Sequence, residues 1–554
     1  MVNPVEQTLS LKRSGTSSRS FVWQMAATVA VWIFVIVLHW HNDGLWYQGD
    51  SSMHALNGVF WMDFLKKLPG NPQGFALSYY ARYPAINPIS YPPVFYLLEA
   101  AAFAIFGVSP FIAKGLVLCF TLLGSLYLLA WLRRFVAEEA GWAAALLLLQ
   151  PAILIWSHAV MLNLPSMALG LASLYHCRRW LEQPGLGRHL YSAAAFALLA
   201  TLTYMTTAVV VLLMICWVVL DRKLSLLLTR RTLAVAALCG VLLVPWFAIS
   251  LKWDSGHRQV GLVQGAYPAW KLASWAYYLK ELPHMITLPI LLLAAASPIV
   301  FFLSQRWRKE MIFVYVWFVI CYGWYSLFSV KETRYALLLV PPALLLAAVT
   351  LVAAIQGFFA TQPGRSSALT IGALTALLLI HIGVARRVYV PEITGIREIA
   401  LAVQQMAPNE WVFYDGHYTL LFTFYVRAQD PGFQRGVVRS SKLLYATKID
   451  VAFGLTELVA SAAEVAKAIR TECGCRYLVV EKQQALESQA QLYLREALAD
   501  GDFQLVKTFP IESPRTKEVE VYEYKGPVVR SEYEEIPLPS LGEGGVRRVK
   551  PYTP

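Results

Sequence analysis

Residues 21–58 read FVWQMAATVAVWIFVIVLHWHNDGLWYQGDSSMHALNG, and this stretch raises the question of the fold. Residues 21–40 are apolar and long enough to cross a bilayer as one helix. No small-residue cleavage site follows, so we expect a retained anchor and not a removed signal peptide. Asp50 comes shortly after the apolar run, and His54 lies four residues further on. A carboxylate in this position is either an idle loop residue or a functional group at the membrane surface.

The composition of the whole chain excludes a soluble globular protein. Of 554 residues, 57% are hydrophobic and 15% are charged, whereas about 25% are charged in soluble domains. A single soluble core stops growing near roughly 250–300 residues, so one soluble core cannot bury this many hydrophobic residues. The net charge of +12 does not indicate nucleic acid, because Lys and Arg concentrate in short loops that orient helices and meet anionic headgroups.

The lengths of the apolar runs predict a polytopic α-helical membrane protein. Runs of roughly 17–23 residues have the length that a spanning helix needs. We expect about eleven transmembrane helices, with the short run at 92–107 left as a re-entrant or interfacial helix. The predicted spans are 21–40, 110–132, 140–157, 159–177, 190–206, 207–220, 232–251, 284–303, 311–329, 334–355 and 367–386.

The distribution of Lys and Arg selects the topology. Counting residues 92–107 as a span would place Arg133 and Arg134 outside and reverse every later loop. Leaving that run out places all basic loops inside, as the positive-inside rule requires, with the N-terminus inside and the C-terminus outside. These basic residues are Lys12, Arg13, Arg133, Arg134, Arg178, Arg179, Arg188, Arg222, Lys223, Arg230, Arg231, Arg306, Arg308 and Lys309. The outer face then collects Asp50, in the first outer loop at 41–109, and Asn163, Tyr204, Lys331 and Arg334 in later turns.

Three further segments complete the predicted organisation. Residues 387–526 alternate helix-like and strand-like stretches, such as IREIALAVQQMA (396–407) before EWVFYDG (410–416), and predict a small extracytoplasmic α/β domain. This segment has no Gly-rich phosphate loop. Residues 1–20 are expected to form a disordered cytoplasmic arm, and residues 527–554 a disordered tail.

Three motifs together resemble those of the GT-C membrane glycosyltransferases. They are YQGDSSMHALNG (47–58), YPPVFYLLEAAAFAIFG (91–107) and KETRYALLLVPP (331–342). The most similar branch, glycosyltransferase family 39-like, includes protein O-mannosyltransferases and bacterial aminoarabinose transferases. In that family an acidic motif in the first outer loop supplies the catalytic aspartate, a Pro-Pro segment opens a membrane-surface helix, and a basic-Tyr-Pro signature begins a late span. The resemblance covers residues 20–355 and implies a GT-C domain over 21–386.

The resemblance implies that Asp50 is the catalytic base. Such an enzyme needs a carboxylate here because the acceptor hydroxyl loses its proton as it attacks the anomeric carbon of the sugar. A base on one face and a phosphate leaving group on the other give inversion of configuration. His54 stands where relatives carry Tyr or His and would orient Asp50. Ser51 replaces the Glu that often follows, so no metal site is predicted, and a divalent cation is left open as a cofactor.

The KETRY turn is implied to bind the phosphate of the donor. Lys331 and Arg334 would supply the fixed positive charge that a phosphate leaving group needs, with Tyr335 beside them. The alternative is that these basic side chains only extend to lipid headgroups. Tyr91 stands before Pro92 where relatives often carry Lys or His, and it can hydrogen-bond a phosphate oxygen without adding charge.

Three other residues are candidates for binding the sugar or the acceptor. Asn163 lies where many relatives have a second acidic residue, and its amide can bind hydroxyls but cannot act as a base at ordinary pH. Tyr204 lies in another outer turn. His158 shares a turn with Asn163, and its alternative role is that of an ordinary interfacial histidine.

The expected function is an inverting glycosyltransferase of a bacterial-type plasma membrane. It would move a sugar from a polyprenyl-phosphate donor to a hydroxyl of a protein, lipid or glycan on the outer face, without a nucleic-acid partner. A transporter or flippase of lipid-linked sugars is the main alternative, but it would bury charges at the mid-membrane, whereas the charges here gather at the ends of spans. A scaffold or receptor with an outer sensing domain would leave the three motifs unexplained.

Overall fold

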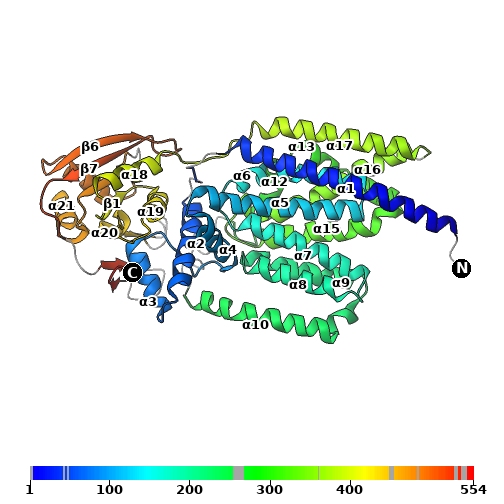
Figure 1. Cartoon of the computed structure of the whole chain (residues 1–554), viewed down its shortest axis with the longest axis horizontal. Helices are drawn as coiled ribbons and strands as arrows, with labels where there is room; N and C mark the ends of the chain where they lie inside the picture. Colours follow the sequence, from blue (N-terminus) through cyan, green and yellow to red (C-terminus); the bar gives the residue numbers. More distant parts are fainter. Residues whose placement is uncertain are drawn as a thin grey trace.

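A computed structural model shows a long helical bundle with a mixed α/β unit at one end (Figure 1). The helices of the first loop, α2, α3 and α4, lie between these two parts. The structure describes residues 4–553 except 41–43, 46–48, 254–266, 360, 448–453, 483–485, 530–533 and 538–545. Tyr47 and Gln48, the first two residues of the acidic motif, therefore lie outside the described residues.

The bundle is built from helices that follow the predicted apolar runs. Many of their large apolar side chains form one extended buried cluster, and a smaller separate cluster contains Val31, Val35 and Leu148. The bundle elements are α1 (Pro4–Leu38), α5 (Pro110–Phe135), the 3₁₀ segment η1 (Glu139–Leu149), α6 (Pro151–Ser157), α7 (Asn163–Glu182), α8 (Gly187–Thr201), η2 (Met205–Ala208), α9 (Val209–Leu220), η3 (Leu224–Leu228), α10 (Arg230–Trp253), α12 (Leu272–Met285), α13 (Leu288–Ala295), α14 (Ser297–Leu303), α15 (Gln305–Ser326), η4 (Thr333–Leu339), α16 (Val340–Phe358) and α17 (Pro363–Ala385).

Fewer of these helices qualify as membrane spans than the sequence predicted. In the described residues, five are long and apolar enough, namely Arg19–Leu38, Pro110–Phe135, Arg230–Ser250, Thr333–Phe358 and Gly364–Ala385. A sixth is added if η1 and α6, which meet at 58°, form one bent span. The predicted number of eleven is not confirmed. One reason is length: the apolar helix Leu288–Leu303, within the predicted span 284–303, is shorter than a spanning helix needs. The chain is nonetheless a helical membrane protein.

The first loop folds into three short helices. They are α2 (Asp50–Lys67), α3 (Pro72–Arg82) and α4 (Val94–Phe106). The 13 residues of α4 span about 20 Å at about 1.5 Å per residue, which is less than the roughly 30 Å of a hydrocarbon core. This length agrees with the prediction that residues 92–107 do not cross the membrane.

The α/β unit contains a mixed sheet with the strand order β2-β1-β5-β7-β6. Strand β1 pairs in parallel with β2 and β5, and β7 pairs antiparallel with β5 and β6. Both predicted helix–strand pairs are present, as α18 before β1 and α21 before β5. The elements are α18 (Ile396–Met406), β1 (Val412–Asp415), α19 (Thr419–Ala428), β2 (Val437–Arg439), α20 (Ser440–Leu443), β3 (Tyr445–Thr447), β4 (Leu455–Glu457), α21 (Ala462–Ala468), η6 (Ile469–Cys473), β5 (Tyr477–Glu481), α22 (Gln489–Leu498), β6 (Phe503–Pro510) and β7 (Glu518–Tyr524).

One face of this sheet belongs to the same core as the bundle. Along β1, Val412 and Tyr414 join the main buried cluster, whereas Phe413 joins a second cluster with Leu494 of α22. Alternate side chains of a strand point to opposite faces, which explains this division. The α/β unit is therefore packed on the first loop through one face of its sheet.

A buried ion pair ties the α/β unit to α2. Both Asp63 of α2 and Arg427 of α19 are nearly fully buried, and the Arg427 Nη2 atom lies 2.7 Å from Asp63 Oδ2 and 2.9 Å from Oδ1. The Tyr79 hydroxyl donates a further hydrogen bond of 2.8 Å to Asp63 Oδ2. These contacts fix the direction of the helix that begins with Asp50.

Both ends of the chain differ from the sequence prediction. Helix α1 begins at Pro4, so the arm predicted to be disordered over 1–20 is helical there, since extending an existing helix costs little. In the segment 527–554, β8 (Glu534–Pro537) pairs antiparallel with β9 (Val546–Val549). Tyr552 packs against Phe75 and donates a backbone hydrogen bond to the Ser78 carbonyl. Contacts with α3 thus hold the described residues around Tyr552, in a segment whose polar composition alone predicted disorder.

Candidate active site

Asp50 is the first residue of α2, which places its carboxylate at the positive end of a helix. Gly49 precedes it with φ 76°, a backbone conformation that glycine adopts without steric cost. Negative charge is electrostatically favourable at a helix N-terminus. The Asp50 side chain is 38% exposed, so a substrate can reach it.

Arg334 binds Asp50 from the start of η4. Its Nη1 atom donates a hydrogen bond of 3.0 Å to Asp50 Oδ2. The same guanidinium contacts Glu332, with Nε at 2.7 Å from Oε2 and Nη2 at 3.0 Å from Oε1. It also lies against the rings of Trp156 and Tyr335. The side chain is 9% exposed, so these contacts hold a positive charge at a defined place beside the carboxylate.

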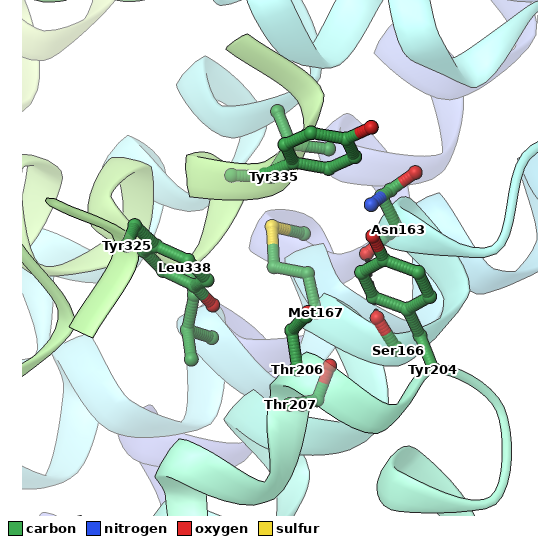
Figure 2. A pocket seen from close by; sticks show the side chains of 10 residues that line it. Asn163, Ser166, Met167, Tyr204, Thr206, Thr207, Tyr325, Tyr335 and Leu338 are labelled. Carbon is green, nitrogen blue, oxygen red and sulfur yellow. Dashed lines mark hydrogen bonds between the residues drawn. The ribbon is translucent and has the colours of Figure 1, made fainter. Parts of the chain in front are cut away.

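A pocket is lined by Asn163, Tyr204 and Tyr335, among other residues (Figure 2). Tyr335 follows Arg334 in the chain and forms one wall, and the Tyr204 ring stacks on it with 6.4 Å between centroids. The space measures about 200 Å³, including the part open to solvent. The lining residues are Asn163, Ser166, Met167, Tyr204, Thr206, Thr207, Tyr325, Tyr335, Leu337 and Leu338. The structure thus brings together Asp50, Asn163, Tyr204, Arg334 and Tyr335, which lie far apart in the sequence.

Tyr91 lies close to Asp50, and His54 packs against Tyr91. Burial and the charge of Asp50 raise the pKa of the Tyr91 hydroxyl, so this group stays a proton donor. The His54 ring meets Tyr91 edge-on at 4.9 Å, and its Nδ1 lies 2.7 Å from the Tyr96 hydroxyl. The contact with Tyr96 joins His54 to α4, which packs against α2. That His54 orients Asp50 stays a prediction.

Lys331 has a different environment from the one predicted. Its Nζ donates hydrogen bonds to the carbonyls of Tyr325, at 3.0 Å, and Ser326, at 2.7 Å. These residues end α15, where carbonyls lack helical partners and attract a cation. Burial lowers the pKa of Lys331 to about 8, so the group is still mostly charged at neutral pH. This geometry supports a helix-capping role and does not support the predicted contact with a donor phosphate.

His158 does not belong to the pocket. It is buried at the end of α6, its Nδ1 lies 3.0 Å from the Leu154 carbonyl, and its ring meets His39 of α1 edge-on at 5.7 Å. The turn that carries both His158 and Asn163 points the two side chains in different directions. Sugar or acceptor binding by His158 therefore lacks structural support, and the interfacial alternative fits better.

The carboxylates near the pocket are already paired. Within the described residues, no group of three or more His, Cys, Asp or Glu side chains could hold a metal ion. Asp50 and Glu332 both contact Arg334. The divalent cation that the resemblance left open stays a prediction.

Several residues of the site were not predicted from the sequence. Glu332 stands inside the quoted KETRY motif, and Thr206 and Thr207 follow Tyr204 directly, so adjacency was an available signal. Tyr325 comes from the end of α15 and reaches the pocket only through the packing of that helix. No sequence pattern indicated it.

Comparisons with known proteins agree with this architecture. A family model described as dolichyl-phosphate-mannose-protein mannosyltransferase matches residues 90–249. The structure is similar to that of ArnT from Cupriavidus metallidurans bound to undecaprenyl phosphate, with a TM-score of 0.61, 14% sequence identity, and 91% of this chain and 98% of that chain covered. No curated protein sequence matches the chain.

A second similar structure is the Archaeoglobus fulgidus oligosaccharyltransferase tethered to an acceptor peptide. Its TM-score is 0.53 at 12% identity, with 83% of this chain and 69% of that chain covered. The chain has the GT-C fold. The resemblance first seen in three short motifs is thereby confirmed. Because the match to ArnT covers 91% of the chain, the likeness of this GT-C protein extends beyond the bundle into the α/β unit.

Proposed function

We propose that this GT-C protein is an inverting glycosyltransferase that moves a sugar from a polyprenyl-phosphate donor to an acceptor hydroxyl on the outer face of the membrane. The observation that carries the proposal is the contact between Arg334 and Asp50 beside a pocket of hydroxyl groups and aromatic rings. A base for the acceptor hydroxyl and a cation for the leaving phosphate are the two groups that this transfer needs, one toward each face of the anomeric carbon.

The proposed reaction gives these two residues different roles. The acceptor hydroxyl gives its proton to the Asp50 carboxylate, and its oxygen forms a bond to the anomeric carbon of the donor sugar. The bond from that carbon to the phosphate oxygen breaks on the opposite face, and the phosphate leaves with the electron pair. Arg334 stabilises the negative charge that grows on the phosphate, because its guanidinium can bind two oxygens at once. Because the transfer is one displacement, the configuration of the anomeric carbon is inverted.

Two comparisons support a lipid-linked donor. The structure of ArnT that this chain resembles was solved with undecaprenyl phosphate, and the matching family is described by a dolichyl-phosphate donor. Both lipid carriers are polyprenyl phosphates, which reach an active site at headgroup level from within the bilayer. The acceptor stays open between a protein, a lipid and a glycan.

The outer-face location rests on the placement of Lys and Arg in the predicted inner loops. Protease added to right-side-out membrane vesicles tests it by cleaving the α/β unit. Protection in these vesicles, with cleavage in inverted ones, would reverse the assignment.

The test of the activity uses the full chain in lipid nanodiscs with a polyprenyl-phosphate monosaccharide. Asp50→Asn keeps the shape of the side chain but removes the proton acceptor, so turnover should fall by roughly 10²–10⁴, while donor binding is kept. Asp500→Asn, at an exposed position of the α/β unit, is the matched control. The product should have inverted anomeric configuration by NMR. Near-normal turnover of Asp50→Asn, or retention of configuration, would contradict the proposal.

The same experiment separates this function from transport. A transporter or flippase would move the lipid-linked sugar across the bilayer without consuming it. Such a protein need not respond to Asp50→Asn.

A further inference from the structure

The guanidinium of Arg334 contacts a carboxylate on each of two edges. Its Nη1 atom donates a hydrogen bond of 3.0 Å to Asp50 Oδ2. Its Nη2 atom donates a hydrogen bond of 3.0 Å to Glu332 Oε1, and its Nε atom lies 2.7 Å from Glu332 Oε2. The two oxygens of Glu332 thus lie along the Nε–Nη2 edge. A guanidinium edge with two nitrogens can bind two oxygens of a carboxylate or a phosphate at once.

The fit of Glu332 to this edge is incomplete. The Nε atom of Arg334 is buried and, although it lies close to Oε2, makes no hydrogen bond of normal geometry with any described residue. A buried donor without an acceptor is costly. An oxyanion whose oxygens meet both Nε and Nη2 would remove this cost, and phosphate is such an oxyanion.

Only the side chain of Glu332 has to move to free this edge. The turn that carries it is anchored, because Lys331 Nζ binds two carbonyl oxygens at the end of α15 and the Tyr335 backbone N–H donates to the Glu332 carbonyl at 3.2 Å. Two aromatic rings hold the Arg334 guanidinium. The Glu332 side chain is 32% exposed, whereas that of Arg334 is 9% exposed. Glu332 can therefore turn into solvent while Arg334 stays beside Asp50.

The donor and the product differ in charge at the phosphate. Under the proposed function the donor is a phosphodiester with a single negative charge. The product is a phosphomonoester, which carries about −1.5 to −2 charges at pH 7. Arg334 therefore attracts the product more strongly than the donor, and the release of the product needs an anion that takes its place. Glu332 is joined to Arg334 through one intervening residue and already contacts the edge in question.

We propose that Glu332 is a placeholder, by which we mean a carboxylate that occupies the Nε–Nη2 edge of Arg334 between reaction cycles. The phosphate of the donor displaces Glu332, and the return of Glu332 to Arg334 releases the polyprenyl phosphate product. Asp50 keeps its contact with Nη1 throughout. The inference rests on the proposed function and adds how its phosphate site is filled and emptied. Glu332 acts through Arg334 and does not touch the reacting atoms.

The dissociation rate of polyprenyl phosphate from the full chain in lipid nanodiscs tests the placeholder. Glu332→Gln keeps the shape of the side chain but removes the charge that competes for Arg334, so dissociation should slow by roughly 2–10-fold. Glu332→Asp keeps the charge on a shorter side chain, and its rate should lie between those of the wild type and Glu332→Gln. Glu398→Gln, at an exposed position of α18, is the matched control and should dissociate as the wild type does.

Two outcomes of this experiment would overturn the inference. One is dissociation from Glu332→Gln that is as fast as from the wild type, or faster. The other applies if Glu332→Gln does not fold, because Glu332→Asp then decides, and a rate at or above that of the wild type contradicts the placeholder.

Inhibition of transfer by added polyprenyl phosphate separates competition from a merely structural role. In Glu332→Gln the inhibition constant should fall by roughly 2–10-fold, and by more than the KM of the donor, because the product carries the larger charge. A structural role would weaken the binding of both lipids and raise both constants, which would contradict the inference. Absence of transfer by the wild type would overturn the proposed function. The dissociation experiment needs no transfer, so the two failures can be told apart.

Discussion

Arg334 donates a hydrogen bond of 3.0 Å to Asp50, although 284 residues separate the two in the chain. Asp50 begins a helix of the first loop, and Arg334 precedes α16 near the end of the bundle. Each residue alone could lack a catalytic role. The Asp50 carboxylate could lie in a solvated loop, and the Arg334 guanidinium could extend to a lipid headgroup. Their contact, with the pocket beside it, makes both of them parts of one site.

Removal of Arg334 should weaken the capture of the donor. In Arg334→Ala, a charge-assisted hydrogen bond to the phosphate is lost, at a cost of about 1.5–3 kcal/mol in binding free energy. Equilibrium binding of bare polyprenyl phosphate to the protein in nanodiscs measures this. Lys331→Ala is the comparison: because Lys331 caps α15, its loss should lower the melting temperature and leave donor affinity close to normal. Normal affinity in Arg334→Ala would return that residue to a purely structural role.

Removal of the Glu332 charge should have the opposite effect on binding. The Glu332 carboxylate occupies the guanidinium that a phosphate would use. Glu332→Gln keeps the shape and weakens this competition, so donor affinity should rise by roughly 0.5–1.5 kcal/mol. Glu398→Gln, at an exposed position of α18, controls for the general loss of one negative charge. A weaker donor affinity in Glu332→Gln would mean that Glu332 positions Arg334 and does not compete with the phosphate.

The Asp63–Arg427 pair should contribute strongly to stability. The two side chains are 6% and 4% exposed, so Asp63→Asn leaves a buried guanidinium without its countercharge and should cost about 3–5 kcal/mol. The double change Asp63→Leu with Arg427→Met should cost less than Asp63→Asn, because no charge is then left unpaired. Thermal unfolding in nanodiscs measures both.

An exposed ion pair in the α/β unit is the control for the effect of burial on the Asp63–Arg427 pair. Lys482 and Glu518 lie 2.9 Å apart with side chains 61% and 47% exposed, and Lys482→Ala should leave the melting temperature nearly unchanged. Equal losses for the buried and the exposed pair would contradict the role assigned to burial.

Glu481 should make the stability of the α/β unit depend on pH. Its Oε1 accepts hydrogen bonds from the Tyr414 hydroxyl, at 2.8 Å, and the Tyr418 backbone N–H, at 2.6 Å. Burial raises the pKa of this carboxyl to about 7, above its unfolded value of about 4.3. The native state therefore binds the extra proton between these values. The stability gained is complete below about pH 4.3 and is lost as the pH rises through about 7.

The magnitude of this loss is on the order of 3 kcal/mol between pH 4 and pH 8. In the wild type, the melting temperature should fall as the pH is raised from 4 to 8. In Glu481→Gln this part of the pH dependence should disappear. An unchanged slope in the variant would assign the effect to another group.

Sequence patterns predicted the architecture where the physics is local. An apolar run long enough for a bilayer can hardly remain in water, so the lengths of these runs alone predicted a membrane protein. Helix-like and strand-like stretches from residue 387 onward predicted α18, β1, α21 and β5, because hydrophobic periodicity is a property of neighbouring residues. The GT-C resemblance likewise came from short motifs, and it named Asp50, Asn163, Arg334 and Tyr335, which the structure brings together with Tyr204.

The tertiary structure decided everything that depends on which side chains meet. The KETRY motif contains two basic residues, and only packing shows that Arg334 turns to Asp50 while Lys331 turns back to the end of α15. His54 pairs with Tyr96 and His158 lies beside His39 for the same reason. The pocket and the Asp63–Arg427 pair bring together residues from helices far apart in the chain. Such partnerships are set by the three-dimensional arrangement of helices, which no local periodicity encodes.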